Sequence, residues 1–336
     1  MHSVVQNNFY IFSVISDTKM KKIAIITPGG DAPGMNAAIR AVVRAGLKHN
    51  FELYGIYRGY QGLLEKDIKQ LNSRSVSGII YKGGTILKSS RCEKIKTLDG
   101  LNQAIEVLKE FKFDYLVVIG GDGSIKAASK ISKYVSVICI PASIDNDVYG
   151  TDETIGFDTA IDTAVSAIDK IRDTATSFER VFVVEVMGRE HGHLALAVAV
   201  ASGAEVVILP EVKYDLDKIA KKLLKDKQKG KTSEIIIFAE GAGNVREFAL
   251  KLEAKINIPV RVSSLGYIQR GGSPSARSRI LASLFGEYAV ELISKNIKNK
   301  VVVIKNNKIE CIDIKTVVSK EKPIDKNLLK LVDELG

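Results

Sequence analysis

The sequence contains few cysteines, and their positions exclude two common structural uses. Its 336 residues include only three, at Cys92, Cys139 and Cys311. An odd number of widely separated thiols fits neither a disulfide framework nor the paired spacing of a structural zinc site. We therefore expect free thiols in a reducing, cytoplasmic compartment.

Long apolar runs are also missing. The run Leu194–Ala201 gives way at once to polar and charged residues, and it is far shorter than the roughly 20 residues that a membrane helix needs. The apolar segment Phe9–Phe12 has no basic region before it, so a secretory signal is not expected. We interpret residues 1–19 as an extension and Met20 as the beginning of the fold, and we expect no membrane partner.

Acidic residues are too few to balance the basic ones. There are 49 Lys and Arg against 39 Asp and Glu, which gives a formal net charge of +10. Such an excess suits nucleic acid, an anionic membrane surface or anionic metabolites. No zinc finger, recognition helix or interleaved aromatic pattern accompanies it, and the densest basic run, Lys221–Lys231, has the periodicity of a solvated helix face. We therefore expect no nucleic-acid partner.

What the sequence does contain is a regular alternation of strand and helix patterns from Lys22 onward. Apolar runs such as Ile23–Ile26 and Tyr115–Ile119 are followed by amphipathic helical segments. This order predicts an α/β fold of two Rossmann-like three-layer domains, with mostly parallel sheets and a site in the cleft between them. We expect a loop-rich stretch over Gly59–Asp99 and a hairpin around Asn306-Asn307.

Three segments rich in glycine or acid follow predicted strands. They are Thr27–Asn36, Gly120–Ser124 and Pro141–Asp147. Glycines let backbone amides approach a polyphosphate closely, and Asp122 supplies an oxygen ligand for Mg²⁺. Asp145 is suited to accept the proton of an attacking hydroxyl. Together these segments predict a phosphotransferase.

Each segment also has a plainer interpretation that the residues alone leave open. Thr27–Asn36 lacks the lysine of a P-loop and the spacing of a dinucleotide fingerprint, so a tight turn explains it equally well. Asp145 and Asp147 lie on one side of the chain if the strand continues, where their repulsion requires Arg or Mg²⁺ nearby. An Asx-rich loop fits the same residues. The missing fingerprint argues against an oxidoreductase.

Two further segments carry arginines beside glycines. In Glu185–His193, Arg189 can neutralise the charge of a transferring phosphoryl group. His191 and His193 suggest a metal site, but no third spaced ligand is visible, and polar loop or cap residues are the favoured explanation. The segment Leu265–Gly272 presents an arginine and a tyrosine as a plausible anion clamp.

Taken together, these segments resemble the bacterial ATP-dependent 6-phosphofructokinase family from Met20 to about Leu331. The resemblance implies transfer of the γ-phosphoryl group of ATP to the 1-hydroxyl of fructose 6-phosphate, with Mg²⁺ as cofactor. It implies a homotetramer with active sites shared between subunits, and ADP or phosphoenolpyruvate as effectors. It also implies a larger ATP-binding domain of residues 20–156 and 269–320, and a smaller substrate-binding domain of residues 157–268 and 321–336.

The resemblance further implies roles for individual residues. The catalytic positions are Asp145 as the base, Asp147, Arg91 and Arg189. The ATP positions are Gly30, Tyr60, Arg91, Cys92, Gly121, Asp122, Gly123 and Ser124, with Asp122 as the Mg²⁺ ligand. The sugar-phosphate positions are Ser143, Ile144, Asp145, Met187, Gly188, Arg189, Glu240, Tyr267 and Arg270, together with Arg180 and Arg261, which reach the sugar phosphate of a neighbouring subunit. The effector positions are Arg40, Arg44, Arg172, Glu205 and Lys231.

The sequence also departs from the family pattern. Ser143 stands where the family usually has Thr, and Tyr267 replaces a usual His, so this position can donate a hydrogen bond but not carry a proton's charge. Ser73 and Thr232 occupy effector positions that basic residues often hold in the family, which leaves the dominant effector open. Pyrophosphate-dependent members typically carry Asp and Lys where this chain has Gly123 and Ala142, which favours ATP. A pyrophosphate-dependent enzyme and a non-catalytic sugar-phosphate-binding homologue are the alternatives.

Overall fold

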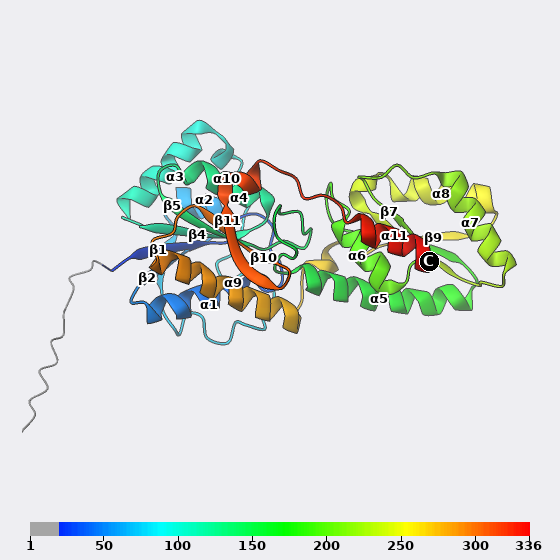
Figure 1. The fold of residues 1–336 in the computed structure, drawn as a ribbon, viewed down its shortest axis with the longest axis horizontal. Coiled ribbons are helices and arrows are strands. Elements are labelled where there is room, and N and C mark those ends of the chain that lie inside the picture. Colours follow the sequence, from blue (N-terminus) through cyan, green and yellow to red (C-terminus); the bar gives the residue numbers. More distant parts are fainter. Residues whose placement is uncertain (1–19) are drawn as a thin grey trace, which may run out of the picture.

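Two α/β lobes lie side by side in the computed structural model, which describes residues 20–336 (Figure 1). Each lobe is a sheet with helices on both faces, which confirms the predicted fold class. The predicted extension, residues 1–19, lies outside the described residues. Within the described part, no helix is both long and apolar enough to cross a lipid bilayer.

The first lobe is built on a sheet to which residues 20–336 contribute seven strands, in the order β11-β10-β5-β4-β1-β2-β3. The five inner strands are parallel, and the edge strands β3 and β11 are antiparallel to their neighbours. The bounds are β1 Lys22–Ile26, β2 Glu52–Ile56, β3 Ile68–Leu71, β4 Tyr115–Gly120, β5 Ser136–Pro141, β10 Lys300–Lys305 and β11 Lys308–Asp313. The carboxyl ends of the inner strands therefore meet at one edge of the sheet.

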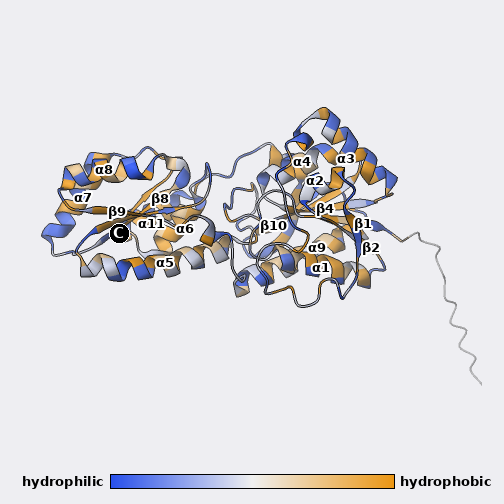
Figure 2. Cartoon of the chain, turned by 180° about the vertical axis from the view of Figure 1, so that it is seen from behind, coloured by the Kyte–Doolittle hydropathy of each residue, from blue (hydrophilic) through white to orange (hydrophobic). Residues whose placement is uncertain are grey.

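Both faces of this sheet are buried, because successive side chains of a strand point to opposite faces. In β1, Ile23 and Ile25 belong to the core with α1 and α9, whereas Ala24 and Ile26 belong to the core with α2, α3, α4 and α10. The bounds are α1 Met35–Lys48, α2 Gly59–Leu64, α3 Leu98–Glu110, α4 Asp122–Ile131, α9 Ala276–Ser294 and α10 Ile314–Val318. Figure 2 shows the matching hydropathy, with apolar strands inside and polar outer helix surfaces.

The second lobe contains a parallel sheet of four strands within the described residues, in the order β7-β8-β6-β9. Helices α5, α6 and α11 pack on one face, and α7 and α8 on the other. The bounds are β6 Val181–Val186, β7 Val206–Ile208, β8 Glu234–Ala239, β9 Val260–Ser264, α5 Phe157–Ser177, α6 His193–Ser202, α7 Leu216–Gln228, α8 Val245–Ile256 and α11 Lys326–Leu335.

The chain passes from the first lobe to the second along α5, returns between β9 and α9, and crosses again through the C-terminal segment that leads to α11 (Figure 1). The hydroxyls of Thr159 in α5 and Ser278 in α9 are 2.8 Å apart, which ties the start of α5 to the first lobe. At the other end of the chain, α11 packs on α6 and β7. The strands of the first sheet fall in residues 20–156 and 269–320, and those of the second in residues 157–268. The domain boundaries themselves stay a prediction.

The prediction of a loop-rich stretch over Gly59–Asp99 is wrong in part, because this stretch includes α2, β3 and the start of α3. Elements as short as α2 and β3 carry too little periodicity to detect, and tertiary contacts stabilise them. Tyr60 and Leu63 of α2 are buried in the core, and β3 pairs with β2. The predicted hairpin is confirmed, since Asn306 and Asn307 join β10 to β11 with φ of 48° and 62°.

Candidate active site

The loops that follow β1, β4 and β5 meet at the carboxyl edge of the first sheet. Ser124 Oγ donates a hydrogen bond to the Pro28 carbonyl at 2.8 Å, and the Tyr60 hydroxyl donates to the Ser124 carbonyl at 2.9 Å. The Ala142 amide donates to the Gly120 carbonyl at 3.1 Å. A Cβ at Gly120 would lie 2.8 Å from the Ser124 side chain, so glycine is required for this approach. The three segments singled out in the sequence therefore share one surface.

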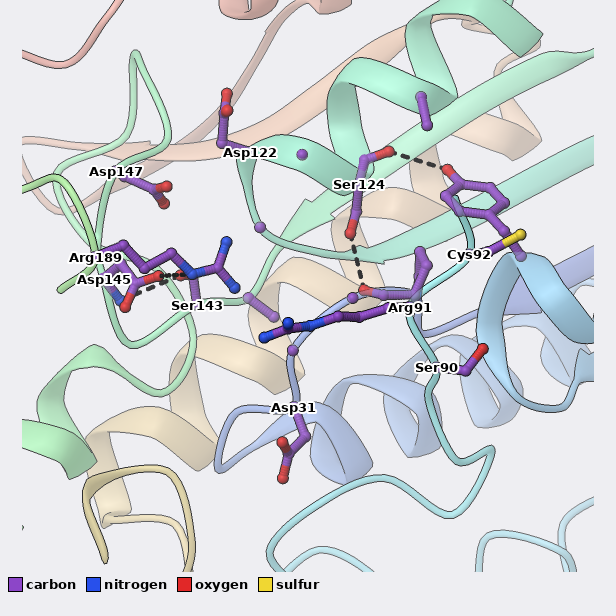
Figure 3. A pocket seen from close by; sticks show the side chains of 18 of the residues that line it. Asp31, Ser90, Arg91, Cys92, Asp122, Ser124, Ser143, Asp145, Asp147 and Arg189 are labelled. Atoms are coloured by element: carbon purple, nitrogen blue, oxygen red, sulfur yellow. Dashed lines mark hydrogen bonds and ion pairs between the residues drawn. The ribbon is translucent and has the colours of Figure 1, made fainter. Parts of the chain in front are cut away.

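A pocket of about 600 Å³ opens over this surface (Figure 3). The predicted site residues that line it are Gly30, Tyr60, Arg91, Cys92, Gly121, Asp122, Gly123, Ser124, Ser143, Ile144, Asp145, Asp147, Met187, Arg189 and Arg270. Met187 and Arg189 come from the turn after β6, so the second lobe also contributes to the wall. The individual roles of these residues stay predictions.

Five of the predicted sugar-phosphate positions lie outside the lining of this pocket. They are Arg180, Gly188, Glu240, Arg261 and Tyr267. The Tyr267 side chain is 75% exposed, and Arg261 is exposed on β9. The Arg180 guanidinium packs 4.5 Å from the centre of the Phe178 ring. Within this chain these three side chains therefore do not reach the pocket.

Glu240 holds the turn that follows β6. Its Oε1 accepts hydrogen bonds from the amides of Gly188 at 3.2 Å and Arg189 at 2.6 Å. Arg189 itself has a left-handed backbone with φ of 54°. In this arrangement Arg189 Nε lies 3.3 Å from Asp145 Oδ2 (Figure 3). Sequence reasoning missed this positioning contact, because Glu240 is 51 residues from Arg189 and meets it only through the pairing of β6 with β8.

Asp145 is a buried carboxylate with a raised affinity for protons. Burial, reinforced by the charge of Asp147, raises the pKa of Asp145 to about 6, while Arg189 acts in the opposite direction. Burial and the charge of Asp122 likewise raise the pKa of Asp147. Asp147 Oδ1 is buried and has no hydrogen-bond partner among residues 20–336. Three acids therefore gather on one side of the pocket, where a divalent cation would relieve their repulsion.

Asp145 and Asp147 do not continue strand β5, as one sequence interpretation assumed. The strand ends at Pro141, and Asn146 has a positive φ of 51°. The Asn146 side chain accepts a hydrogen bond from the Thr154 amide and donates one to the Asp152 carbonyl, both at 3.1 Å. The segment is therefore an Asn-pinned loop, and both carboxylates nevertheless line the pocket.

Sequence reasoning also missed polar residues of the lining, among them Asp31 and Ser90. Asp31 Oδ1 lies 2.9 Å from a terminal nitrogen of Arg270, and it restrains this arginine at the pocket wall. The sequence could have indicated Asp31, because this residue lies inside the glycine-rich turn after β1. Ser90 Oγ donates to the Arg58 carbonyl at 2.7 Å and lies in the stretch predicted as loop, where nothing in the residue pattern marks it.

The predicted effector positions divide between the two lobes. In the second lobe, the buried carboxylate of Glu205 pairs with Lys231 at 2.8 Å and with Arg172 at 3.8 Å. Arg40 and Arg44 lie on α1 of the first lobe. Within residues 20–336, no ion pair joins them to Glu205. A single chain therefore assembles only part of this predicted set.

A cleft between two α/β lobes, with open glycine turns and clustered acids at strand ends, defines the protein as a phosphotransferase by class. The family model for phosphofructokinase matches residues 22–293, and the chain belongs to this family. It is 50% identical over 318 residues to the ATP-dependent 6-phosphofructokinase of Bacillus pumilus (strain SAFR-032), covering 94% of this chain and 100% of the relative. The enzyme of that name from Clostridioides difficile (strain 630) is also 50% identical, with the same coverage.

Solved structures agree with this assignment. Pichia pastoris phosphofructokinase in the T-state superposes with a TM-score of 0.86 at 36% identity, over 90% of this chain and 36% of that one. The chain therefore spans about a third of the length of that relative. A pyrophosphate-dependent phosphofructokinase from Marinobacter aquaeolei has a TM-score of 0.81 at 21% identity, over 93% of this chain and 91% of that one, which shows a shared fold alone.

The raised pKa of Asp147 predicts that its charge destabilises the protein at neutral pH when divalent cations are absent. The folded state disfavours the ionised form, so this cost is present above the raised pKa and disappears as the pH falls below it. Asp147→Asn should raise the Tm at pH 7 in EDTA by up to a few degrees. The gain should shrink as the pH approaches about 4, the ordinary pKa of an aspartate. Calorimetry beside the exposed control Asp173→Asn measures this, and an unchanged or lower Tm at pH 7 contradicts it.

Proposed function

We propose that this chain is an ATP-dependent 6-phosphofructokinase, which transfers the γ-phosphoryl group of ATP to the 1-hydroxyl of fructose 6-phosphate and releases fructose 1,6-bisphosphate and ADP. The names of the relatives at 50% identity support this proposal. The observation that carries it is a buried Asp145 beside Arg189 in the same pocket as the N-terminus of α4. One cavity thus holds a base for the sugar hydroxyl that accepts the phosphoryl group and backbone amides for the phosphates of ATP.

The donor end of the pocket fits a polyphosphate. Helix α4 begins at Asp122 without a side-chain cap, so its first amides are open to an anion. A Cβ at Gly123 would meet no atom within 4 Å, which leaves room for a ligand beside it. Arg91 adds positive charge from the lining. The proposed donor site is completed by Gly30, Tyr60, Cys92, Gly121 and Ser124.

Mg²⁺ is the proposed cofactor, and the residues present fit it. Asp122 and Asp147 line the same pocket, the charge of Asp122 acts on Asp147, and Asp147 Oδ1 has no partner in the described part of the chain. Asp122 is half-buried and pairs with Lys126 at 2.6 Å. Mg²⁺ is typically held by one or two carboxylates and substrate phosphates, and it supplies charge neutralisation for phosphoryl transfer. Asp122 is the proposed ligand, with Asp147 beside it.

At the acceptor end, Asp145 accepts the proton of the attacking sugar hydroxyl, and Arg189 and Arg91 stabilise the charge that develops on the transferring group. Ser143 Oγ accepts a hydrogen bond from the Asp145 amide at 3.1 Å and so restrains the base. The proposed sugar-phosphate contacts are Ser143, Ile144, Asp145, Met187, Gly188, Arg189, Glu240, Tyr267 and Arg270.

The remaining predicted positions are proposed to act in a homotetramer. Arg180 and Arg261 lie outside the pocket of their own chain, which supports contact with the sugar phosphate of a neighbouring subunit. A neighbour would also supply Arg40 and Arg44 to the cluster of Glu205, and ADP or phosphoenolpyruvate are the proposed effectors there. Initial rates measured with either compound added test this regulation. A cytoplasmic location fits the three free thiols.

Replacing the proposed base should remove turnover while leaving the donor end intact. Asparagine has the shape of aspartate but accepts no proton, so Asp145→Asn should lower kcat by about 10²–10⁴ with little change in the KM for ATP. A coupled assay of fructose 1,6-bisphosphate formation measures this, with Asp173→Asn as the surface control. Near-normal kcat would refute the role of Asp145. Wild-type binding of fructose 6-phosphate without turnover would instead identify a non-catalytic homologue.

The raised pKa of Asp145 should set the acid limb of the pH profile. The base works only when ionised, so kcat/KM should rise with pH through about 6 and then level, rather than through the ordinary value of about 4. The Asp147→Asn variant lacks the negative charge of Asp147 that helps to raise the pKa of Asp145. The midpoint of the acid limb should therefore move to lower pH in this variant. Rates between pH 4.5 and 8 test both statements. A flat profile down to pH 4.5 would exclude Asp145 as the titrating base.

The position of Gly123 at the donor end of the pocket predicts that a negative charge introduced there weakens the binding of ATP. Gly123→Ala should fold normally, because its methyl group meets no protein atom within 4 Å, and it should raise the KM for ATP less than a charged side chain does. Gly123→Asp should raise that KM at least about tenfold, since a carboxylate there repels the phosphates, and tenfold corresponds to only ~1.4 kcal/mol. Assays with ATP and pyrophosphate as separate donors measure this. An unchanged KM in the Asp variant contradicts the donor placement, and wild-type preference for pyrophosphate overturns the proposed donor.

A further inference from the structure

Three potential metal ligands gather outside the pocket, in the second lobe. His191, His193 and Glu211 each place one donor atom within 4.8 Å of the others. None of the three lines the active-site pocket. His191 lies in the turn after β6, His193 is the first residue of α6, and Glu211 follows β7. The sequence shows no third ligand near the two histidines, and the fold supplies one in Glu211, which follows β7.

His193 is the member that requires a partner. Its side chain is only 7% exposed, and its Nε2 is buried with no hydrogen-bond partner within residues 20–336. A buried ring nitrogen without a partner is costly, and most such groups in folded proteins are satisfied. The ring of His191 stacks beside it, with centroids 5.9 Å apart. Coordination of a cation would satisfy this nitrogen.

The carboxylate of Glu211 is already oriented toward the histidines. One of its oxygens accepts a hydrogen bond from the Gly192 amide at 2.8 Å, between the two histidines in sequence. Within residues 20–336, no hydrogen bond or ion pair engages the other oxygen, so it can ligate. Zinc ligands lie about 2.0–2.2 Å from the metal, so tetrahedral donors are separated by about 3.4 Å. Donor atoms that start within 4.8 Å of one another reach this spacing by small side-chain rotations.

We propose that His191, His193 and Glu211 form a binding site for a divalent transition metal, with Zn²⁺ as the best-suited ion. Two imidazoles and one carboxylate are ligands that Zn²⁺ favours, and three protein ligands leave a fourth position for water or an added ligand. Mg²⁺ prefers all-oxygen coordination, so this site and the proposed Mg²⁺ site select different ions.

The metal would add a tie between two segments that the hydrogen bond from the Gly192 amide to Glu211 already joins. The His191 amide donates to the Gly188 carbonyl at 3.0 Å, so the ligand belongs to the turn that carries Arg189. Glu211 belongs to the segment after β7. A bound ion therefore clamps this turn, and because it binds only the folded arrangement it stabilises the protein against unfolding.

The test uses the untagged full-length chain, stripped of metal and kept free of nucleotide and Mg²⁺. Titration with Co²⁺ should give the visible absorption of a tetrahedral site with one equivalent bound, and Zn²⁺ should displace it and raise the Tm by several degrees. His191→Ala and Glu211→Gln should each weaken binding by at least about tenfold, the loss expected from even an indirect ligand change. His49→Ala removes an exposed histidine of the first lobe and should bind the metal as the wild type does.

Neither test substitution is in the core, since His191 is half-buried and Glu211 exposed, and circular dichroism verifies that both variants fold. The proposal is overturned if the wild type binds no equivalent of Co²⁺ or Zn²⁺, or if both variants bind as tightly as the wild type. Because no nucleotide or sugar is present, the outcome does not depend on the phosphotransferase activity.

Discussion

The site depends on the parallel alignment of β1, β4 and β5. Their register brings three carboxyl ends to one edge of the sheet, and the loops that follow are then close enough to bond to one another. The hydrogen bond from Ser124 to the Pro28 carbonyl and the absence of a side chain at Gly120 make this contact possible. A helix N-terminus and the loop that carries Asp145 are thereby fixed beside each other, as phosphoryl transfer requires.

The same convergence places acids where the fold alone would not favour them. Asp145 and Asp147 are buried, and burial raises the pKa of both. One carboxylate oxygen of Asp147 has no partner in the described residues. Such local instability is typical of functional sites, because groups held ready for a ligand are incompletely satisfied without it. The apolar core on both faces of the first sheet holds these groups in place.

The second lobe contributes through one turn. Glu240 at the end of β8 fixes the backbone of Arg189 at the end of β6, and the arginine then reaches Asp145 in the first lobe. The other end of this turn contains His191 and leads into His193 at the start of α6, and these are two of the three proposed metal ligands. A single short segment therefore carries both Arg189, which lines the cleft, and two of the proposed metal ligands, which gives a bound metal a physical route to the position of Arg189.

The sequence by itself determined the alternation of strands and helices, the glycine turns and the acids after β4 and β5, because these depend on local residue patterns. It also identified the family, since the ordered motifs lie along the whole chain. Short elements such as α2 and β3 escaped, as their stability comes from burial and pairing. The contact of Glu240 with Arg189, the ion pair of Asp31 with Arg270 and the meeting of Glu211 with the histidines were decided only by the tertiary structure. Each joins segments far apart in sequence, and only the pairing and packing of whole elements brings them within reach.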